Sequence, residues 1–264
     1  MSHTTILTET RDRVGIIRLN RPHKLNAWNA TMSGEIVEQM TEWNDDPAIG
    51  AILMTGEGRA FCAGADIDGF AERVKTNTQP GGGEAIRRGG ASLTHFIRSS
   101  KPTVAAINGY AVGVGLTMIL PFDVRIASKN ALLSIRFIKM GLMPELGSTR
   151  LLANLIGLGP ATDMCLTGRM VPADEALAMG LVTAVTDPED LETVAMEKAT
   201  EIANNPTQAV MMIKELLSRN PMDADLEAVM ERENIRDQIA RRLPDHREAV
   251  EAFKEKRKAN FNSD

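Results

Sequence analysis

The sequence predicts an α/β protein, with a core in which strands and helices alternate and a C-terminal region that is helical. Short apolar runs typical of buried strands recur up to about residue 150, and segments with apolar residues at helical spacing lie between them. After Arg150, helical segments dominate the pattern. We therefore expect a core over residues 1–200 and a helical region over residues 201–264, both within one structural unit.

Hydrophobic periodicity predicts the individual elements in chain order. Residues 14–19 and 51–54 are short apolar runs, as expected for buried strands. Residues 31–43 carry apolar side chains at helical spacing, and Asp45-Asp46-Pro47 should end that helix. Further strands are expected at 6–9, 103–107, 124–127, 131–135 and 181–185. Further helices are expected at 115–120, 150–156, 160–167, 173–179, 189–204, 207–218, 225–241 and 247–258.

Residues 68–92 form the least regular part of the sequence. Residues 76–83 are polar and glycine-rich, and Gly89-Gly90 adds a second pair of glycines. Such a composition is typical of a surface segment. We expect a mobile surface segment, and the sequence leaves open whether it lies over a site.

Composition and charge exclude several classes of protein. The net charge of −5 argues against a general nucleic-acid-binding protein, which would show a basic footprint. No run reaches the roughly 18 apolar residues of a membrane span, and the N-terminal residues do not resemble a signal peptide. The two cysteines, Cys62 and Cys165, provide neither a disulfide framework nor a metal-ligand spacing. We expect a cytoplasmic protein without a metal site.

Two loops of small residues are the most informative feature of the core. They cover residues 62–67 (Cys-Ala-Gly-Ala-Asp-Ile) and 108–115 (Asn-Gly-Tyr-Ala-Val-Gly-Val-Gly), and each follows an apolar run. Small side chains allow a ligand to approach the backbone closely. One N–H from each loop could then bind the same oxygen and form an oxyanion hole. A tight turn packed against a helix is the alternative for the first loop. The second loop lacks the third glycine and the downstream acid of a dinucleotide-binding fingerprint.

One acidic residue, Glu145, lies downstream in the sequence Gly-Leu-Met-Pro-Glu-Leu-Gly-Ser. It could act as a general base whose pKa is tuned by an apolar pocket. It could instead be a surface acid near the start of the helix at Thr149-Arg150. Arg136 could pair with Glu145 and lower its pKa, a question that the sequence leaves open.

The C-terminal segment 253–261 is basic and ends in a phenylalanine. A charged run of this kind is usually the solvated face of a helix. Contact with phosphate groups is the alternative.

In combination, these segments resemble the crotonase superfamily, the enoyl-CoA hydratases and isomerases. The resemblance covers nearly the whole chain. It implies a spiral of ββα units with a helical C-terminal region that drives trimerisation. It also implies a homotrimer or a dimer of trimers that processes acyl-CoA thioesters, with coenzyme A as part of the substrate and no other cofactor. The segments that carry the resemblance are 21–27, 63–67, 101–115, 141–150 and 251–261.

The resemblance also implies roles for individual residues. The oxyanion-hole N–H groups would belong to Ala65 and Val114. The C-terminal positions that contact coenzyme A in the family would be Phe253 and Lys256, which favours phosphate contact for the basic segment. The positions that hold the adenine and pantetheine of coenzyme A would be Lys24, Leu25, Ala63, Asp66 and Ile67.

The sequence departs from the family pattern where the chemistry takes place. Hydratases of the family use two glutamates to activate water, and Thr117 and Phe137 stand at these positions. Neither is a useful base at neutral pH, so we expect both to line a drier substrate pocket. Glu145 stands where Δ3,Δ2-enoyl-CoA isomerases of the peroxisomal type have their catalytic glutamate, and where the ring-epoxide isomerase of phenylacetate breakdown has an aspartate.

The favoured prediction is therefore a Δ3,Δ2-enoyl-CoA isomerase with Glu145 as its single acid and base. Three alternatives remain on the same scaffold: enoyl-CoA hydration, other enolate chemistry such as thioester hydrolysis or decarboxylation, and acyl-CoA binding without catalysis.

Overall fold

The computed structural model describes residues 3–67 and 92–262. The larger of its two sheets has six strands in the order β1-β2-β3-β5-β7-β10, and all neighbours are parallel except β1 and β2. The inner strands are buried on both faces, as is typical of a parallel sheet that is covered on both sides. The strands of this sheet are β1 (Ile6–Arg11), β2 (Val14–Leu19), β3 (Ala51–Gly56), β5 (Thr103–Ile107), β7 (Val124–Ser128) and β10 (Ala184–Thr186).

A second, smaller sheet contains four short strands in the order β4-β6-β8-β9. β4, β6 and β8 are parallel, and β9 is antiparallel to β8. The first selected loop, residues 62–67, begins with the last residue of β4, and the second, residues 108–115, contains β6. The strands of this sheet are β4 (Ala60–Cys62), β6 (Tyr110–Val112), β8 (Leu132–Ser134) and β9 (Val171–Pro172).

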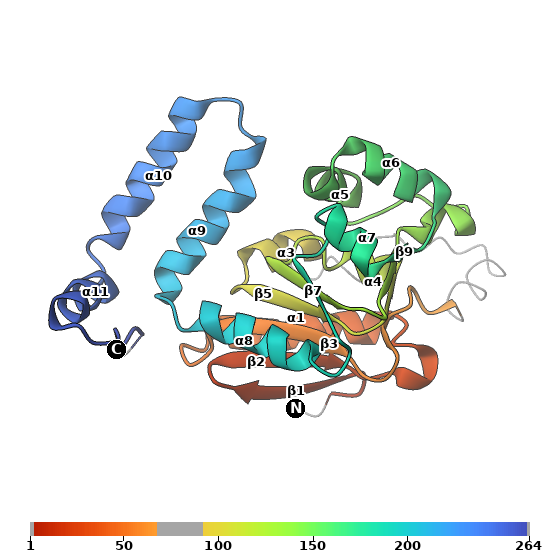
Figure 1. Cartoon of the computed structure of the whole chain (residues 1–264), viewed down its shortest axis with the longest axis horizontal. Coiled ribbons are helices and arrows are strands. Elements are labelled where there is room, and N and C mark those ends of the chain that lie inside the picture. Colours follow the sequence, from red (N-terminus) through yellow and green to blue (C-terminus); the bar gives the residue numbers. More distant parts are fainter. Residues whose placement is uncertain (1–2, 68–91, 263–264) are drawn as a thin grey trace.

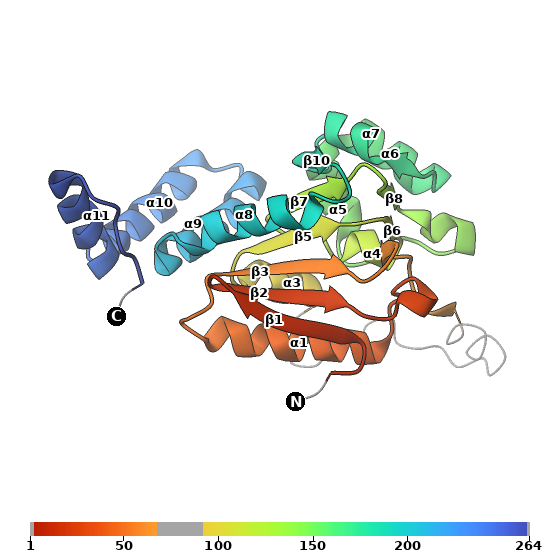
Figure 2. The ribbon, with the colours of Figure 1, turned by 60° about the horizontal axis from the view of Figure 1, so that its bottom comes forward.

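The helices cover both faces of the larger sheet, with α1 on one face and α8 on the other (Figure 2). Asn29 begins α1 with a cap, since its side chain accepts a hydrogen bond from the Met32 N–H at 2.9 Å. The α-helices are α1 (Ala30–Asp45), α3 (Leu93–Ser99), α4 (Val114–Thr117), α5 (Ser148–Ile156), α6 (Leu158–Thr167), α7 (Ala173–Ala178), α8 (Leu191–Ala203), α9 (Thr207–Arg219), α10 (Leu226–Ala240) and α11 (Pro244–Glu255). The 3₁₀ helices are η1 (Pro22–Lys24), η2 (Arg136–Met140) and η3 (Asn220–Met222).

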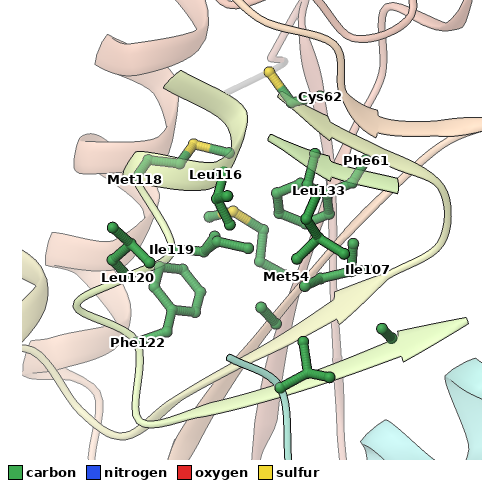
Figure 3. Close-up of a cluster of buried hydrophobic side chains, with 14 of the residues drawn as sticks. Met54, Phe61, Cys62, Ile107, Leu116, Met118, Ile119, Leu120, Phe122 and Leu133 are labelled. Carbon is green, nitrogen blue, oxygen red and sulfur yellow. The ribbon is translucent and has the colours of Figure 1, made fainter. Parts of the chain in front are cut away.

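Two clusters of buried apolar side chains form the core. One lies between α8 and the larger sheet, and the other fills the space among α1, both sheets and α4–α7. Figure 3 shows part of this second cluster, in which Phe61 from β4, Leu116 from α4 and Leu133 from β8 pack together. The small sheet and α4 therefore share one core with the larger sheet.

The C-terminal helices α9, α10 and α11 stand to one side of the core (Figure 1). α9 is attached through Lys214, whose buried ammonium group donates to Asp123 Oδ2 at 2.8 Å and to the Lys101 carbonyl at 3.2 Å. Arg98 of α3 also donates to the Ser218 carbonyl of α9. α10 packs against α9, so the helical region continues outward from this attachment.

The predicted α/β core and its helical C-terminal region are confirmed, and the strand at 103–107 has the predicted bounds. The predicted helix at 115–120 was too long, because α4 ends at Thr117. The predicted strand at 181–185 begins three residues later and is shorter, at Ala184–Thr186. The sequence analysis missed β4, β6, β9 and α3, which are too short for a clear periodicity. The expected surface segment at 68–92 lies outside the described residues except for Ser92.

Candidate functional site

Three segments with predicted site residues leave the same edge of the smaller sheet. Residues 63–67 follow β4, residues 113–117 follow β6, and η2 with Phe137 follows β8. These three strands are adjacent and parallel, so the segments begin at neighbouring carboxyl ends. This is the edge at which α/β proteins commonly bind ligands. The fold therefore brings together Ala63, Ala65, Val114, Thr117 and Phe137.

The two small-residue loops are in direct contact. A Cβ built on Gly115 would lie 2.2 Å from the Cys62 carbonyl oxygen, a distance at which no side chain fits. A Cβ built on Gly113 would lie 3.9 Å from the Gly64 Cα and 4.0 Å from Phe137 Cε2. Gly113 also has a φ of +56°, which favours glycine. The close approach of the two backbones thus depends on glycine at position 115, whereas at position 113 the positive φ favours glycine and the space would admit a Cβ.

The direction of the Ala65 N–H follows from its pairing with Trp28. The Trp28 N–H donates to the Gly64 carbonyl at 2.8 Å, and the Asp66 N–H donates to the Trp28 carbonyl at 2.9 Å. In such a parallel bridge the middle residue, Ala65, directs its own N–H away from the partner strand. The Ala65 N–H is therefore available to a ligand.

The Val114 N–H is available for a different reason. Val114 is the first residue of α4, and the first N–H groups of a helix have no acceptor within it. Within residues 3–67 and 92–262, neither this N–H nor that of Ala65 donates to a protein acceptor. Two unused N–H groups on touching loops are consistent with the predicted oxyanion hole.

Glu145 lies in the segment between η2 and α5. The Leu142 N–H donates to the Phe137 carbonyl at 3.0 Å, and Thr94 Oγ1 donates to the Leu146 carbonyl at 2.8 Å. These bonds hold the segment at both ends. Leu146 has a φ of +58°, a conformation that is uncommon outside glycine and that occurs often at functional sites.

The Glu145 carboxylate is half-buried and has no hydrogen bond or ion pair with any described residue. Burial raises the pKa of this carboxyl above its ordinary value. Arg136 forms no ion pair with it within the described part of the chain, so the pairing that the sequence left open does not counteract this effect. A desolvated carboxylate with a raised pKa is a better base than an exposed one.

The raised pKa of Glu145 predicts the pH at which activity is lost on the acid side of a pH–rate profile. If Glu145 is the base that the sequence predicts, it must be deprotonated to act, so kcat/KM should fall as the pH drops through the pKa of Glu145. We expect the midpoint of this limb to lie above ~4.3, the ordinary value of a glutamate. The measurement is kcat/KM against pH with the wild-type enzyme. A limb centred at or below the ordinary value would contradict the assignment.

Two hydroxyl groups near these segments are buried without a protein partner. Thr117 is fully buried at the end of α4, and its Oγ1 has no hydrogen bond within the described residues. The same holds for Ser148 Oγ, three positions after Glu145. The sequence analysis missed Ser148. A serine close to the start of a helix was the available sequence signal. In the structure, however, Ser148 is the first residue of α5 and Gly147 is the residue that precedes the helix.

The predicted coenzyme A residues of the first loop form one group. Lys24 Nζ lies 3.4 Å from Asp66 Oδ2, and the Ala63 N–H donates to the Leu25 carbonyl at 3.0 Å. The Ile67 side chain is 62% exposed beside them, so it is open to contact by a ligand. The sequence analysis missed Arg21 as a member of this group, although its Nη2 lies 2.7 Å from Asp66 Oδ2.

Phe253 and Lys256 are not brought to the other site residues within one chain. Phe253 is 85% exposed on α11, and Lys256 follows the end of that helix. Figures 1 and 2 show α11 on the opposite side of the molecule from α4 and α5. A single chain therefore presents these two residues away from its own candidate site.

The described residues contain no group of three or more acidic, histidine or cysteine side chains arranged to hold a metal ion. Within the same part of the chain, none of the helices combines the length and hydrophobicity that crossing a membrane requires.

Comparison with known proteins identifies similar chains along the whole length. The family model for enoyl-CoA hydratase/isomerase matches residues 9–264. A Mycobacterium tuberculosis protein named "Probable enoyl-CoA hydratase echA8" is 38% identical over 99% of both chains. The 1,2-epoxyphenylacetyl-CoA isomerase of Escherichia coli is 34% identical over 97% of both. The crystal structure of an enoyl-CoA hydratase from Bacillus anthracis superimposes with a TM-score of 0.89 at 31% identity, covering 99% of this chain and 100% of that one.

Proposed function

Because this chain belongs to the enoyl-CoA hydratase/isomerase family, we propose that it is a Δ3,Δ2-enoyl-CoA isomerase that uses Glu145 as its single acid and base. The observation that carries this proposal is the half-buried Glu145 carboxylate, which lacks a partner among the described residues. Thr117 and Phe137 occupy the two positions at which the resemblance expects water-activating glutamates. Glu145 is thus the carboxylate left for the proton transfer.

The proposed reaction moves one proton along an allylic system. The thioester carbonyl of a 3-enoyl-CoA accepts hydrogen bonds from the Ala65 and Val114 N–H groups. Glu145 removes a proton from C2, and the electron pair of the C–H bond delocalises into a dienolate whose negative charge rests on the thioester oxygen. The protonated Glu145 then returns the proton to C4, and the double bond ends between C2 and C3. No water is consumed, which agrees with an apolar Phe137 close to Gly113 of the second loop.

We assign the first-loop group to binding of the coenzyme A part of the substrate. Ala63, Asp66 and Ile67 share the loop of Ala65, and Lys24 and Leu25 contact that loop. A thioester bound at the Ala65 N–H would therefore extend its pantetheine and adenine toward this group. Coenzyme A enters as part of the substrate, and the mechanism needs no other cofactor. The two cysteines, Cys62 buried and Cys165 half-buried, suit a reducing compartment such as the cytoplasm.

A paired assay on the purified protein tests the proposal. Isomerisation of 3-hexenoyl-CoA and hydration of crotonyl-CoA are measured under the same conditions. Isomerisation that is much faster than hydration supports the proposal, and fast hydration with slow isomerisation would contradict it. No turnover of either substrate, together with tight binding of a CoA ester, would instead indicate a binding protein.

Hydration is the second candidate function, since the Mycobacterium tuberculosis and Bacillus anthracis relatives carry hydratase names. In that case the unpartnered Thr117 hydroxyl would help to hold the water and Glu145 would activate it.

We further propose that the chain assembles as a homotrimer or a dimer of trimers through its helical region. The helices α9–α11 and η3 expose many apolar side chains that the core does not cover, a pattern typical of an interaction surface. In such an assembly, Phe253 and Lys256 of one chain could reach the coenzyme A of another. The exposed apolar residues of this region are Ile213, Leu217, Met222, Leu226, Met230, Ile235, Ile239, Val250 and Phe253.

The assembly proposal predicts the effect of a charge in this surface. Leu217 of α9 is 68% exposed in the single chain, so Leu217→Asp should shift the sedimentation profile toward smaller species and lower the activity. Leu7→Asp, at an exposed leucine of β1, is the control and should leave the profile unchanged. A wild-type protein that sediments as a monomer at all concentrations would disprove the assembly.

A further inference from the structure

Asn26 is a fully buried polar residue that the proposed mechanism does not use. Its amide nitrogen donates to the Glu57 carbonyl at 2.9 Å and to the Ala60 carbonyl at 2.7 Å. Its amide oxygen accepts from the Arg21 N–H at 2.8 Å. Two donors and one acceptor are satisfied in one orientation only, since reversing the amide would lose all three bonds. The side chain therefore fixes residues 57–60, which lead into β4, against the turn at residues 21–28.

The backbone of the turn is shaped for this contact. Leu25 and Asn26 both have positive φ values, +51° and +55°, and asparagine tolerates this conformation better than most residues. The Asn26 N–H also donates to the Arg21 carbonyl at 2.9 Å. Asn26 thus closes the turn through hydrogen bonds with the backbone N–H and carbonyl of Arg21.

The 21–28 turn forms hydrogen bonds with three residues of the first loop, Ala63, Gly64 and Asp66. The Leu25 carbonyl accepts from the Ala63 N–H, and Trp28 exchanges hydrogen bonds with Gly64 and Asp66 on either side of Ala65. Arg21 adds a side-chain clamp, because it donates to the Ala27 carbonyl and to Asp66 Oδ2. The position of the Ala65 N–H is consequently set by the 21–28 turn.

The second loop also forms hydrogen bonds with residues 56–60, the segment that leads into β4. Asn108, two residues before β6, donates to the Gly58 carbonyl at 2.8 Å and accepts from the Gly56 N–H at 3.2 Å. Two asparagines therefore bind the 56–60 turn by hydrogen bonds. Asn26 belongs to the turn that holds the first loop, and Asn108 belongs to the second loop. A change at Asn26 would shift the Ala65 N–H relative to Val114.

We propose that Asn26 is a positioning residue that sets the geometry of the oxyanion hole by fixing the 21–28 turn, and with it the Ala65 N–H, against the 56–60 segment. This inference rests on the proposed function, in which the Ala65 and Val114 N–H groups bind the thioester oxygen. Asn26 acts through the backbone and does not touch the substrate.

Asn26→Asp tests the inference in the full-length protein. It keeps the size of the side chain but places an oxygen against the Glu57 and Ala60 carbonyls. Loss of one oxyanion donor lowers kcat by about 10²- to 10³-fold, so a displaced donor should lower kcat for 3-hexenoyl-CoA about 10- to 100-fold. KM should rise less than kcat falls, because Lys24 and Leu25 of the same turn are assigned to the coenzyme A part, whereas the displaced donor acts on the thioester oxygen.

A spectroscopic measurement separates positioning from a general loss of structure. Hexanoyl-CoA with ¹³C at the thioester carbonyl is bound to each protein, and the carbonyl stretch is recorded by infrared difference spectroscopy. An intact hole polarises the carbonyl and lowers its frequency, and this lowering should shrink in Asn26→Asp. The control is Asn44→Asp, which removes another half-buried amide that bonds Ser100 and Lys101 away from the site. Its kcat and carbonyl frequency should match those of the wild type.

An unchanged carbonyl frequency or kcat in Asn26→Asp would overturn the inference. If Asn26→Asp does not fold, Asn26→Ser replaces it, since the shorter side chain cannot bridge the Arg21 N–H to both the Glu57 and the Ala60 carbonyls. The same loss of polarisation is then expected, and no loss would overturn the inference. A wild-type protein that binds hexanoyl-CoA without lowering the frequency would instead disprove the oxyanion hole itself.

Discussion

Glu145→Gln is expected to lower kcat for the isomerisation of 3-hexenoyl-CoA about 1,000-fold, within the range that general acid–base catalysis contributes. Glutamine has nearly the same shape as glutamate, but its amide does not accept a proton at neutral pH. The Glu145 carboxylate has no partner within the described residues, so the substitution breaks no known bond there. KM and stability should therefore change little. The rate is followed by the ultraviolet absorbance of the conjugated product.

The matched control for this prediction is Glu38→Gln, at an exposed position of α1, which should retain the wild-type kcat. Isomerisation at the wild-type rate in Glu145→Gln would show that another group carries the proton. Hydration of crotonyl-CoA that survives the substitution would likewise show that Glu145 does not activate the water.

The second large effect is expected for Gly115→Ala. The added Cβ would lie 2.2 Å from the Cys62 carbonyl oxygen and 2.9 Å from the Cys62 carbonyl carbon. Backbone atoms cannot swing aside as a side chain can, so the two small-residue loops must separate. We expect a loss of about 3 kcal/mol in the free energy of unfolding, the upper part of the usual range for overpacking. This corresponds to a fall in Tm of roughly 8 °C for a chain of this size. Activity should fall as well, because a displacement of Gly115 also displaces the N–H of the preceding residue, Val114, which is a proposed oxyanion donor.

Thermal and urea unfolding at one fixed protein concentration measure this effect, since oligomers are stabilised by concentration. Gly34→Ala is the control. Gly34 lies in α1 with no atom within 4 Å of its built Cβ, so alanine should raise stability by about 0.5–1 kcal/mol. A Gly115→Ala protein as stable and active as the wild type would contradict the close contact of the loops.

The longer elements could be predicted from the sequence because their side-chain patterns are local. Burial on both faces gives β3 an unbroken apolar run, and the helical spacing of Met32, Ile36 and Met40 marks α1. β4 and β6 could not be predicted in this way. Each has three residues, fewer than a period-two pattern needs to be distinguished from a loop.

The sequence by itself determined the α/β class, the helical C-terminal region, the two small-residue loops and the identity of the candidate base. Residue type and spacing along the chain are sufficient for the first three features, and the resemblance to the family selected Glu145 as the candidate base. Only the tertiary structure decided that the loops touch, that Ala65 directs its N–H away from Trp28, and that burial raises the pKa of Glu145 with no arginine among the described residues to oppose it. Contacts and desolvation join residues far apart in the chain, so no local pattern encodes them. For the same reason, only the folded chain shows the hydrogen bonds that Asn26 donates to the Glu57 and Ala60 carbonyls, which lie more than thirty residues away in the sequence.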